Sequence, residues 1–256
     1  MDYQFRYVLF VDFLGFSAAI KRATHETWPE IADFIVWATE RANAMSVPAG
    51  GEYTDNGAIT VTCFSDNIVI RFAPPNFQHD WQEMFVAPLY RAFYFRYCKA
   101  FVAHVAAKAL KLNLLVRGGL AFGPLFHDKR GIVGKALIDA YLLESKVACY
   151  PRVVLSPKIC TRQNDELSRD SFVQDADGIW HLDYFSPMAK EAVSMGLASN
   201  AAEWTAVAGQ IAKTNMGLLE KEDRVADCAK WVWFHSHLVN ADTVPLPDAL
   251  TVPTEC

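Results

Sequence analysis

Short apolar runs early in the chain predict strands, and longer segments with apolar residues every three or four positions predict helices. Residues 5–11 are apolar apart from Arg6 and predict a buried central strand. The β-rich runs 58–64 and 67–72 flank Ser65-Asp66 and predict a hairpin. Helical spacing is found in three further segments: 17–24, 28–45 and 81–110.

The second half of the chain continues this mixture. We expect strands at 112–121 and 152–155, a partner strand or hairpin opening at Pro124, and a helix over 134–147. The order β-α-α-β-β-α-β-β-α-β predicts an α+β fold in which helices cover one face of a sheet. The predicted organisation has three parts: a main domain over residues 1–186, a C-terminal helical extension packed on it over 187–240, and a proline-rich tail over 241–256.

Composition and charge narrow the class of protein. The 256 residues are 52% hydrophobic, and the net charge of −5 offers no basic surplus for nucleic acid or an anionic membrane. The six cysteines are scattered without a Cys-x-x-Cys pair, as expected in a reducing cytosol. Charged residues interrupt the N-terminal apolar segment, and no uncharged run is long enough to span a bilayer. We therefore expect a cytoplasmic protein that binds neither nucleic acid nor membranes.

Two aspartates lie where apolar strands end. Asp12 follows the first predicted strand, and Asp66 occupies the tight turn of the predicted hairpin. If the hairpin pairs beside the first strand, both carboxylates come to one edge of the sheet, where a divalent cation relieves their repulsion. Mg²⁺ and Mn²⁺ prefer such oxygen ligands together with substrate phosphates. The structural alternative makes Asp12 a helix cap and Asp66 an ordinary turn residue.

The segment after Asp12 has the features of an anion site. Leu14, Gly15, Phe16 and Ser17 lead directly into a predicted helix. Free N–H groups at such a helix start can cradle phosphate. One strand end therefore offers metal ligands and a phosphate site together.

Four motifs in order resemble the catalytic domain of the class III nucleotide cyclases. "FVDFLGFS" around Asp12 resembles that family's first metal motif, and "CFSDNIVI" around Asp66 resembles the second. "VRGGLAFGPL" is similar to its Arg-x-Gly-x-x-x-Gly-Pro strand and turn. "GKALIDAYLLE" is similar to the helix that follows and keeps Gly134, Ala140 and Glu144.

The resemblance implies an enzyme that cyclises a nucleoside triphosphate. It implies a homodimer with two Mg²⁺ or Mn²⁺ ions per active site, in which the substrate's 3′-hydroxyl attacks its α-phosphorus. Metal binding would fall to Asp12, Asp66 and the carbonyl of Phe13. The segment from Phe13 to Ser17 would contact the nucleotide.

Departures from the family concern the groups that read the base and clamp the phosphate. Thr62 stands where purine cyclases have a lysine four positions before the second aspartate, and the acidic base-reading residue falls near Gly131. The transition-state asparagine and arginine fall near Ile138 and Leu142. The domain is then either a catalytically dead nucleotide-binding module or a divergent cyclase with another base and another clamp. The retained aspartates favour the cyclase.

A narrower resemblance favours a pyrimidine substrate. The missing purine pair, the form of the motif helix and the segment "KWVWFHSHLVN" resemble the bacterial pyrimidine cyclases of the Pycsar anti-phage systems. That resemblance implies a uridylate cyclase, which converts UTP to 3′,5′-cyclic UMP and pyrophosphate and signals to a separate cyclic-nucleotide-sensing effector. A cytidylate cyclase acting on CTP is the first alternative, followed by an adenylate or guanylate cyclase.

Further residues are candidates for substrate contacts. Lys129 and Arg130 precede the motif helix and are candidate catalytic groups that replace the missing clamp in trans; the alternative is a solvated turn. Tyr53 is a candidate to fill volume that a purine would occupy, with Thr62 hydrogen bonding to the base edge, or else an ordinary loop tyrosine. Arg117 has two interpretations, a phosphate contact or a structural ion pair, and the ion pair is favoured.

Overall fold

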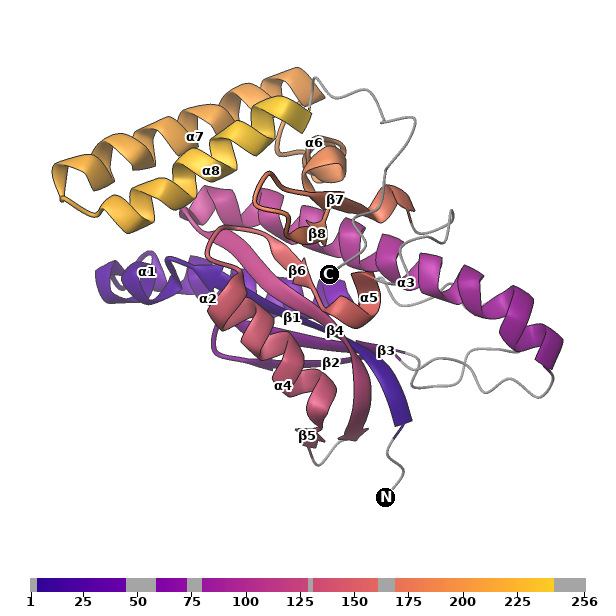
Figure 1. Ribbon diagram of the computed structural model, residues 1–256. Helices are drawn as coiled ribbons and strands as arrows, with labels where there is room; N and C mark the ends of the chain where they lie inside the picture. The colour runs from indigo at the N-terminus through magenta and orange to yellow at the C-terminus, as the bar shows by residue number, and fades with distance from the viewer. Residues whose placement is uncertain (1–3, 45–58, 73–79, 129–130, 161–168, 242–256) are drawn as a thin grey trace.

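The computed structural model describes residues 4–44, 59–72, 80–128, 131–160 and 169–241. An eight-stranded mixed sheet forms the centre, with strand order β2-β3-β1-β4-β6-β8-β7 and β5 paired to β4 (Figure 1). The strands are β1 (Gln4–Leu14), β2 (Ile59–Phe64), β3 (Asn67–Phe72), β4 (Leu115–Asp128), β5 (Gly131–Val133), β6 (Val153–Leu155), β7 (Phe172–Gln174) and β8 (Trp180–Leu182). The sheet and its helices confirm the predicted α+β class.

Helices surround the sheet and form the C-terminal part of the fold. The α-helices are α1 (Phe16–Arg22), α2 (Trp28–Ala44), α3 (Asp80–Ala109), α4 (Lys135–Leu142), α5 (Pro157–Cys160), α6 (Phe185–Ser194), α7 (Ala201–Lys221) and α8 (Val225–Ala241). Three shorter helices complete the set: the 3₁₀-helices η1 (Leu110–Leu112) and η3 (Arg169–Ser171), and the π-helix η2 (Leu143–Val147). Within the described ranges, no helix combines the length and apolar character needed to cross a bilayer.

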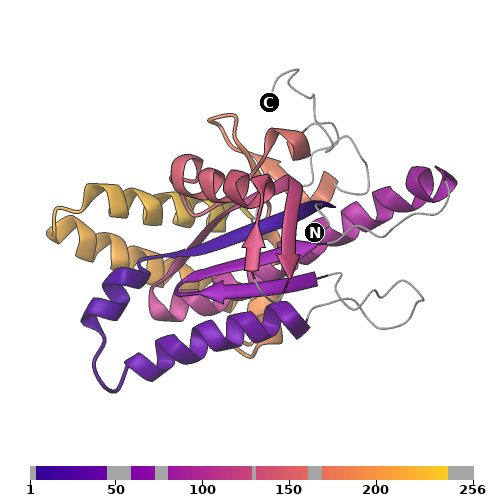
Figure 2. The ribbon, with the colours of Figure 1, turned by 90° about the horizontal axis from the view of Figure 1, so that it is seen from below.

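Successive side chains of β1 point to opposite faces of the sheet and pack into two separate cores. Leu9 and Val11 join the large core that contains residues of α2 and α3, whereas Val8 and Phe10 join a smaller core with Ala136 of α4. Figure 2 shows α2 and α4 on opposite sides of the strands. The long helices thus cover one face, as predicted, and α4 adds a second, smaller layer on the other.

Two glycines in β4 allow this close packing. A Cβ at Gly119 would overlap the carbonyl oxygen of Ala140 in α4, and a Cβ at Gly118 would overlap the carbonyl oxygen of Phe10 in β1. Side chains at these positions would push α4 and β1 away from β4. The paired glycines of the "VRGG" segment therefore let the motif helix lie directly on the sheet.

The first strands match the sequence prediction, whereas β4 differs from it. The hairpin β2–β3 turns at Ser65-Asp66 and β3 pairs antiparallel with β1, as expected. The predicted start of a partner strand at Pro124 is wrong, because β4 runs through Pro124 and pairs it with Phe5. The hairpin expected as the alternative forms slightly later, where the end of β4 pairs with β5 from Phe126 to Asp128. Among the described strands, β6 pairs with β4 only from Gly118 to Leu120. Pro124 therefore lies where the edge of β4 tolerates a missing N–H.

The C-terminal part contains the predicted helices and an unpredicted hairpin. The helices α6, α7 and α8 lie in the region expected to be helical, and α7 and α8 run side by side at one end of the molecule (Figures 1 and 2). The hairpin β7–β8 joins the sheet through Val154 and His181. The large core includes Met188, Trp204 and Phe234, so it extends through this region. The division into a main domain, an extension and a tail stays a prediction.

Candidate functional site

The strand register brings Asp12 and Asp66 to the same end of two neighbouring strands. Val11 pairs with Ile68 in the β1–β3 ladder, so Asp12 lies one residue beyond this pair on β1 and Asp66 two residues before it on the hairpin. Ser65 adopts a φ of 56°, which turns the chain sharply at Asp66. Asp66 is near enough for its charge to act on the Asp12 carboxylate. The predicted juxtaposition of the two carboxylates is confirmed.

Arg117 holds Asp12 at this buried position. The two residues are register partners in β1 and β4, and Arg117 Nε donates to Asp12 Oδ2 over 2.9 Å. The same guanidinium forms a 2.6 Å ion pair between Nη2 and Glu144 Oε1. The favoured interpretation of Arg117 as a structural ion pair is therefore confirmed. One cation offsets the burial of two carboxylates.

Glu144 belongs to this candidate site, and its contact with Asp12 and Arg117 was not predicted from the sequence, where it was noted only as a kept motif residue. It lies in the π-helical turn η2 that continues α4, is only 3% exposed, and hydrogen bonds to Asp12. The available signal was the Glu144 carboxylate kept at the end of the motif helix. Its partner Arg117 lies on another motif, so the sequence alone did not connect the two.

Burial and neighbouring charges hold protons on this group of acids. Burial raises the pKa of Asp12, and the Asp66 charge adds to this, against the opposing effect of Arg117. Burial raises the pKa of Glu144 to about 7; the Asp12 and Asp66 charges also raise it, and Arg117 opposes them. Near neutral pH, Glu144 can therefore donate its proton to Asp12. Such a shared proton is what a bound cation would displace.

The donors at this edge suit a hard divalent cation. Asp12 and Asp66 supply carboxylate oxygens, which Mg²⁺ and Mn²⁺ prefer. Phe13 packs its ring against Phe34 at 5.0 Å between centroids and is 1% exposed, so only its backbone is left for a ligand role. Metal binding by these three residues stays a prediction, and the raised pKa of Asp12 is the observation that fits it.

The helix that was predicted to accept phosphate begins as expected. Gly15 has a φ of 94°, a conformation that favours glycine, and α1 starts at the next residue. Gly15 and Ala18 line a cavity of about 360 Å³ that extends towards α7 and α8. Neither aspartate lines this cavity. Phosphate binding by Leu14, Gly15, Phe16 and Ser17 stays a prediction.

The remaining predicted positions are only partly described. Thr62 lies on β2 opposite Val69, and Gly131 begins β5. Ile138 and Leu142 are exposed on α4. Three predicted contact residues lie outside the described residues: Tyr53, Lys129 and Arg130.

A second cluster of titratable side chains lies outside this site. Asp175, His181 and His237 come from β7–β8 and α8, and their nearest ligand atoms lie within 4.8 Å of one another. Sequence reasoning missed it because the three residues belong to separate elements and show no ligand spacing.

Comparison with known proteins finds distant structural likeness only. No family model matches the chain, and no curated protein matches it. The structure is similar to that of the adenylyl cyclase CyaB from P. aeruginosa, with a TM-score of 0.45 and 16% identity over 71% of this chain and 96% of that one. It is similar to the guanylyl cyclase Cya2 with a TM-score of 0.38 and 17% identity over 71% and 92% of the two chains. Likeness of this degree establishes neither a family nor an activity.

Proposed function

We propose that this protein is a divalent-metal-dependent nucleotide cyclase. The observation that supports the proposal is the meeting of Asp12 and Asp66 at one sheet edge, where burial and the Asp66 charge raise the pKa of Asp12. A strand end that gathers carboxylates in this way is suited to a cation. In the reaction, the ribose 3′-oxygen bonds to the α-phosphorus, the bond to the pyrophosphate oxygen breaks, and the 3′-hydroxyl proton passes to solvent.

Different residues of the site would bind the metal ions, position the metal ligands and bind the phosphates. Asp12, Asp66 and the Phe13 carbonyl would hold two Mg²⁺ or Mn²⁺ ions, which would lower the pKa of the 3′-hydroxyl and neutralise triphosphate charge. Arg117 and Glu144 touch Asp12 and would act as positioning residues. The N–H groups after Gly15 would bind phosphate, and Lys129 and Arg130 would supply the clamp.

A pyrimidine triphosphate is the proposed substrate. Thr62 and the Gly131 region stand where purine cyclases have the lysine and the acidic residue that recognise the purine base. A site that lacks those groups gives a purine fewer hydrogen bonds. We therefore place UTP first, with cyclic UMP and pyrophosphate as products, then CTP, then ATP or GTP. A role in anti-phage signalling through a separate effector follows from the same resemblance.

A homodimer would complete the site. Apolar side chains lie exposed on the sheet face that carries α4, each between 43% and 57% exposed: Phe64, Ile138, Tyr141 and Leu142. Phe10 contacts both Phe64 and Tyr141 edge-on, which makes the surface continuous across the sheet. A surface of this kind is suited to burial against a second copy.

A catalytically dead nucleotide-binding module is the second candidate. Ile138 and Leu142 stand where the family has its transition-state groups, and both are apolar and exposed. If Lys129 and Arg130 do not replace that clamp, the cation site would bind a nucleotide without converting it.

The two candidates are separated by product analysis. Purified protein would be incubated with Mn²⁺ and each labelled ribonucleoside triphosphate in turn, with Asp66→Asn as the control. We expect cyclic UMP or cyclic CMP from the wild type alone. Binding of triphosphate without any cyclic product would reject the cyclase and support the module, whereas cyclic AMP or cyclic GMP as the main product would reject only the pyrimidine assignment.

A further inference from the structure

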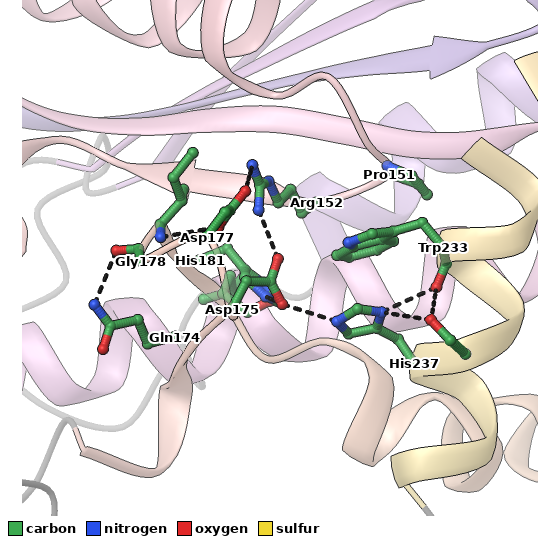
Figure 3. Close-up of polar contacts among 12 residues, drawn as sticks. Pro151, Arg152, Gln174, Asp175, Asp177, Gly178, His181, Trp233 and His237 are labelled. Carbon is green, nitrogen blue, oxygen red and sulfur yellow. Dashed lines mark hydrogen bonds and ion pairs between the residues drawn. The ribbon is translucent and has the colours of Figure 1, made fainter. Parts of the chain in front are cut away.

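Asp175, His181 and His237 form a compact cluster between the hairpin β7–β8 and helix α8. Asp175 follows the last residue of β7, and its N–H bonds to the Ile179 carbonyl over 3.1 Å and closes the turn of the hairpin. His181 lies in β8 and is fully buried, and His237 reaches the cluster from α8. Figure 3 shows Arg152 and His237 reaching Asp175 from two different directions.

The two oxygens of Asp175 have different partners. Oδ1 lies 2.8 Å from His237 Nε2 and 3.2 Å from His181 Nε2. Oδ2 accepts a hydrogen bond from Arg152 Nη1 over 2.6 Å, and Arg152 also bonds Asp177 over 2.7 Å. Arg152 therefore orients the carboxylate so that Oδ1 faces both imidazoles.

The other ring nitrogen of each histidine fixes its tautomer. His237 Nδ1 lies 2.9 Å from the Trp233 carbonyl and 3.3 Å from Ser236 Oγ, and that hydroxyl donates its own hydrogen to the Trp233 carbonyl over 2.7 Å. His181 Nδ1 lies 3.2 Å from the Leu182 carbonyl. A carbonyl only accepts, so both Nδ1 atoms carry the hydrogen. In the neutral rings both Nε2 atoms are then lone-pair acceptors, and both face the acceptor Oδ1. Three acceptors directed at one another require a cation between them.

A proton satisfies this arrangement only in part. A proton on His237 would bridge the 2.8 Å contact to Asp175. His181 Nε2 would still be buried without a partner in hydrogen-bonding geometry among the described residues. Protonating both rings would place two imidazolium ions and Arg152 around the same carboxylate. A single metal ion instead accepts all three lone pairs.

The surroundings are those of a metal site. Histidines that bind metals usually donate their other N–H to a carbonyl, and metal-binding carboxylates are themselves hydrogen bonded, as both histidines and Asp175 are here. Trp233 stacks on His237 at 3.7 Å between centroids and holds the ring in place. With neutral histidines, Arg152 faces two carboxylates, Asp175 and Asp177, so the group carries a net charge of −1 that a dication would reverse.

From this geometry we propose that Asp175, His181 and His237 bind a Zn²⁺ ion that ties helix α8 to the hairpin β7–β8. Two imidazoles and one carboxylate are the ligand types that Zn²⁺ takes, with a water in the fourth position. Tetrahedral ligands lie about 3.3 Å apart, so the 2.8 Å contact between His237 Nε2 and Asp175 Oδ1 would lengthen by about 0.5 Å, and the two imidazole nitrogens, within 4.8 Å of each other, would close around the ion. The site is independent of the proposed cyclase centre, which uses oxygen ligands on β1 and the β2–β3 turn.

Zinc stoichiometry tests the proposal. Full-length protein would be stripped with EDTA, incubated with Zn²⁺, and measured for bound metal and thermal unfolding. His237→Gln should bind one Zn²⁺ fewer per chain than the wild type and lose the zinc-dependent rise in Tm. His235→Gln, two residues away on the same helix, is the matched control and should behave as the wild type does. Zinc bound at the aspartate site or by cysteines should be the same in wild type and His237→Gln, so it does not affect the difference between their stoichiometries.

A measurement on the wild type avoids any dependence on how the variants fold. X-ray absorption of zinc-loaded protein should show two imidazole ligands. A spectrum without imidazole, or equal zinc stoichiometry in wild type and His237→Gln, would overturn the proposal.

Discussion

Arg117 is the residue on which the candidate site depends. It pairs with Asp12 across β1–β4 and with Glu144 in η2, and both carboxylates are largely buried. Two carboxylates at a strand edge are costly without this cation. Among the described residues the site is short of positive charge, because the Arg117 guanidinium pairs with Asp12 and Glu144 while the Asp66 charge acts on both of these carboxylates.

Removing the guanidinium should destabilise the fold strongly. We expect Arg117→Met to lower the free energy of unfolding by about 3–5 kcal/mol, since it leaves Asp12 and Glu144 without their partner. Arg117→Lys keeps the charge and should lose less. Urea denaturation at neutral pH without metal measures both variants. A loss below about 0.5 kcal/mol in Arg117→Met would mean that the ion pair does not hold Asp12.

His104 should make stability sensitive to acid. Burial lowers its pKa, with Arg41 and Lys108 adding to this effect and Glu191 opposing it. The unfolded chain therefore takes up this proton first as the pH falls through about 6.5, and stability is lost below that value. Between about pH 7 and about pH 5.5, the wild type should lose more unfolding free energy in urea titrations than His104→Gln. An equal loss in both proteins would show that His104 does not carry this sensitivity.

At the scale of elements, the close approach of α4 to β4 organises the site. Gly119 lies beneath Ala140, and α4 continues into the π-helical turn that presents Glu144 to Arg117. The position of Glu144 therefore depends on the close approach of Gly119 in β4 to Ala140 in α4. Strand β4 lies two strands away from β3, the strand that follows Asp66.

A methyl group at Gly119 should displace α4. Gly119→Ala should destabilise the protein by about 1–3 kcal/mol, as overpacking does, because the new Cβ meets a backbone carbonyl. Gly217→Ala in α7 is the control, since nothing lies within 4 Å of its Cβ position and alanine favours a helix. Thermal unfolding compares the two variants. If both behaved alike, α4 would not require the glycine.

Elements with a clear apolar pattern could be predicted from the sequence, whereas the short hairpin β7–β8 could not. The strand β1 and the hairpin β2–β3 have long apolar runs with clear turn residues. The strands β7 and β8 have three residues each, too few for alternation to show, and they join the sheet by a single pair, Val154 with His181. Pro124 was misplaced because local propensity does not reveal which strand edge is unpaired.

At the scale of the whole molecule, the apolar face around α4 is the proposed dimer surface. Asp12 and Asp66 could be predicted because Asp12 lies near the end of one strand and Asp66 in the turn between two others, and the patterns of these strands are visible in the sequence. Glu144 and the cluster around Asp175 could not, because they depend on which helix face and which hairpin meet after folding.

A charge on this surface should separate the subunits. Ile138 is 57% exposed, so Ile138→Lys should leave the monomer folded while converting the dimer to monomers and reducing cyclisation. Val225→Lys, at a 72% exposed position in α8, is the control. Analytical ultracentrifugation reads the outcome. A variant at Ile138 that remains as dimeric as the wild type would remove this face from the account.

The most direct test of the account is the dependence of cyclisation on Mn²⁺ and the two aspartates. Labelled UTP would be converted by wild type, Asp12→Asn and Asp66→Asn over a range of Mn²⁺ concentrations, with circular dichroism to verify that all three are folded. We expect Mn²⁺-dependent cyclic UMP from the wild type and none from either folded variant. Cyclic UMP formed without divalent metal, or formed at the wild-type rate by either variant, would contradict this expectation.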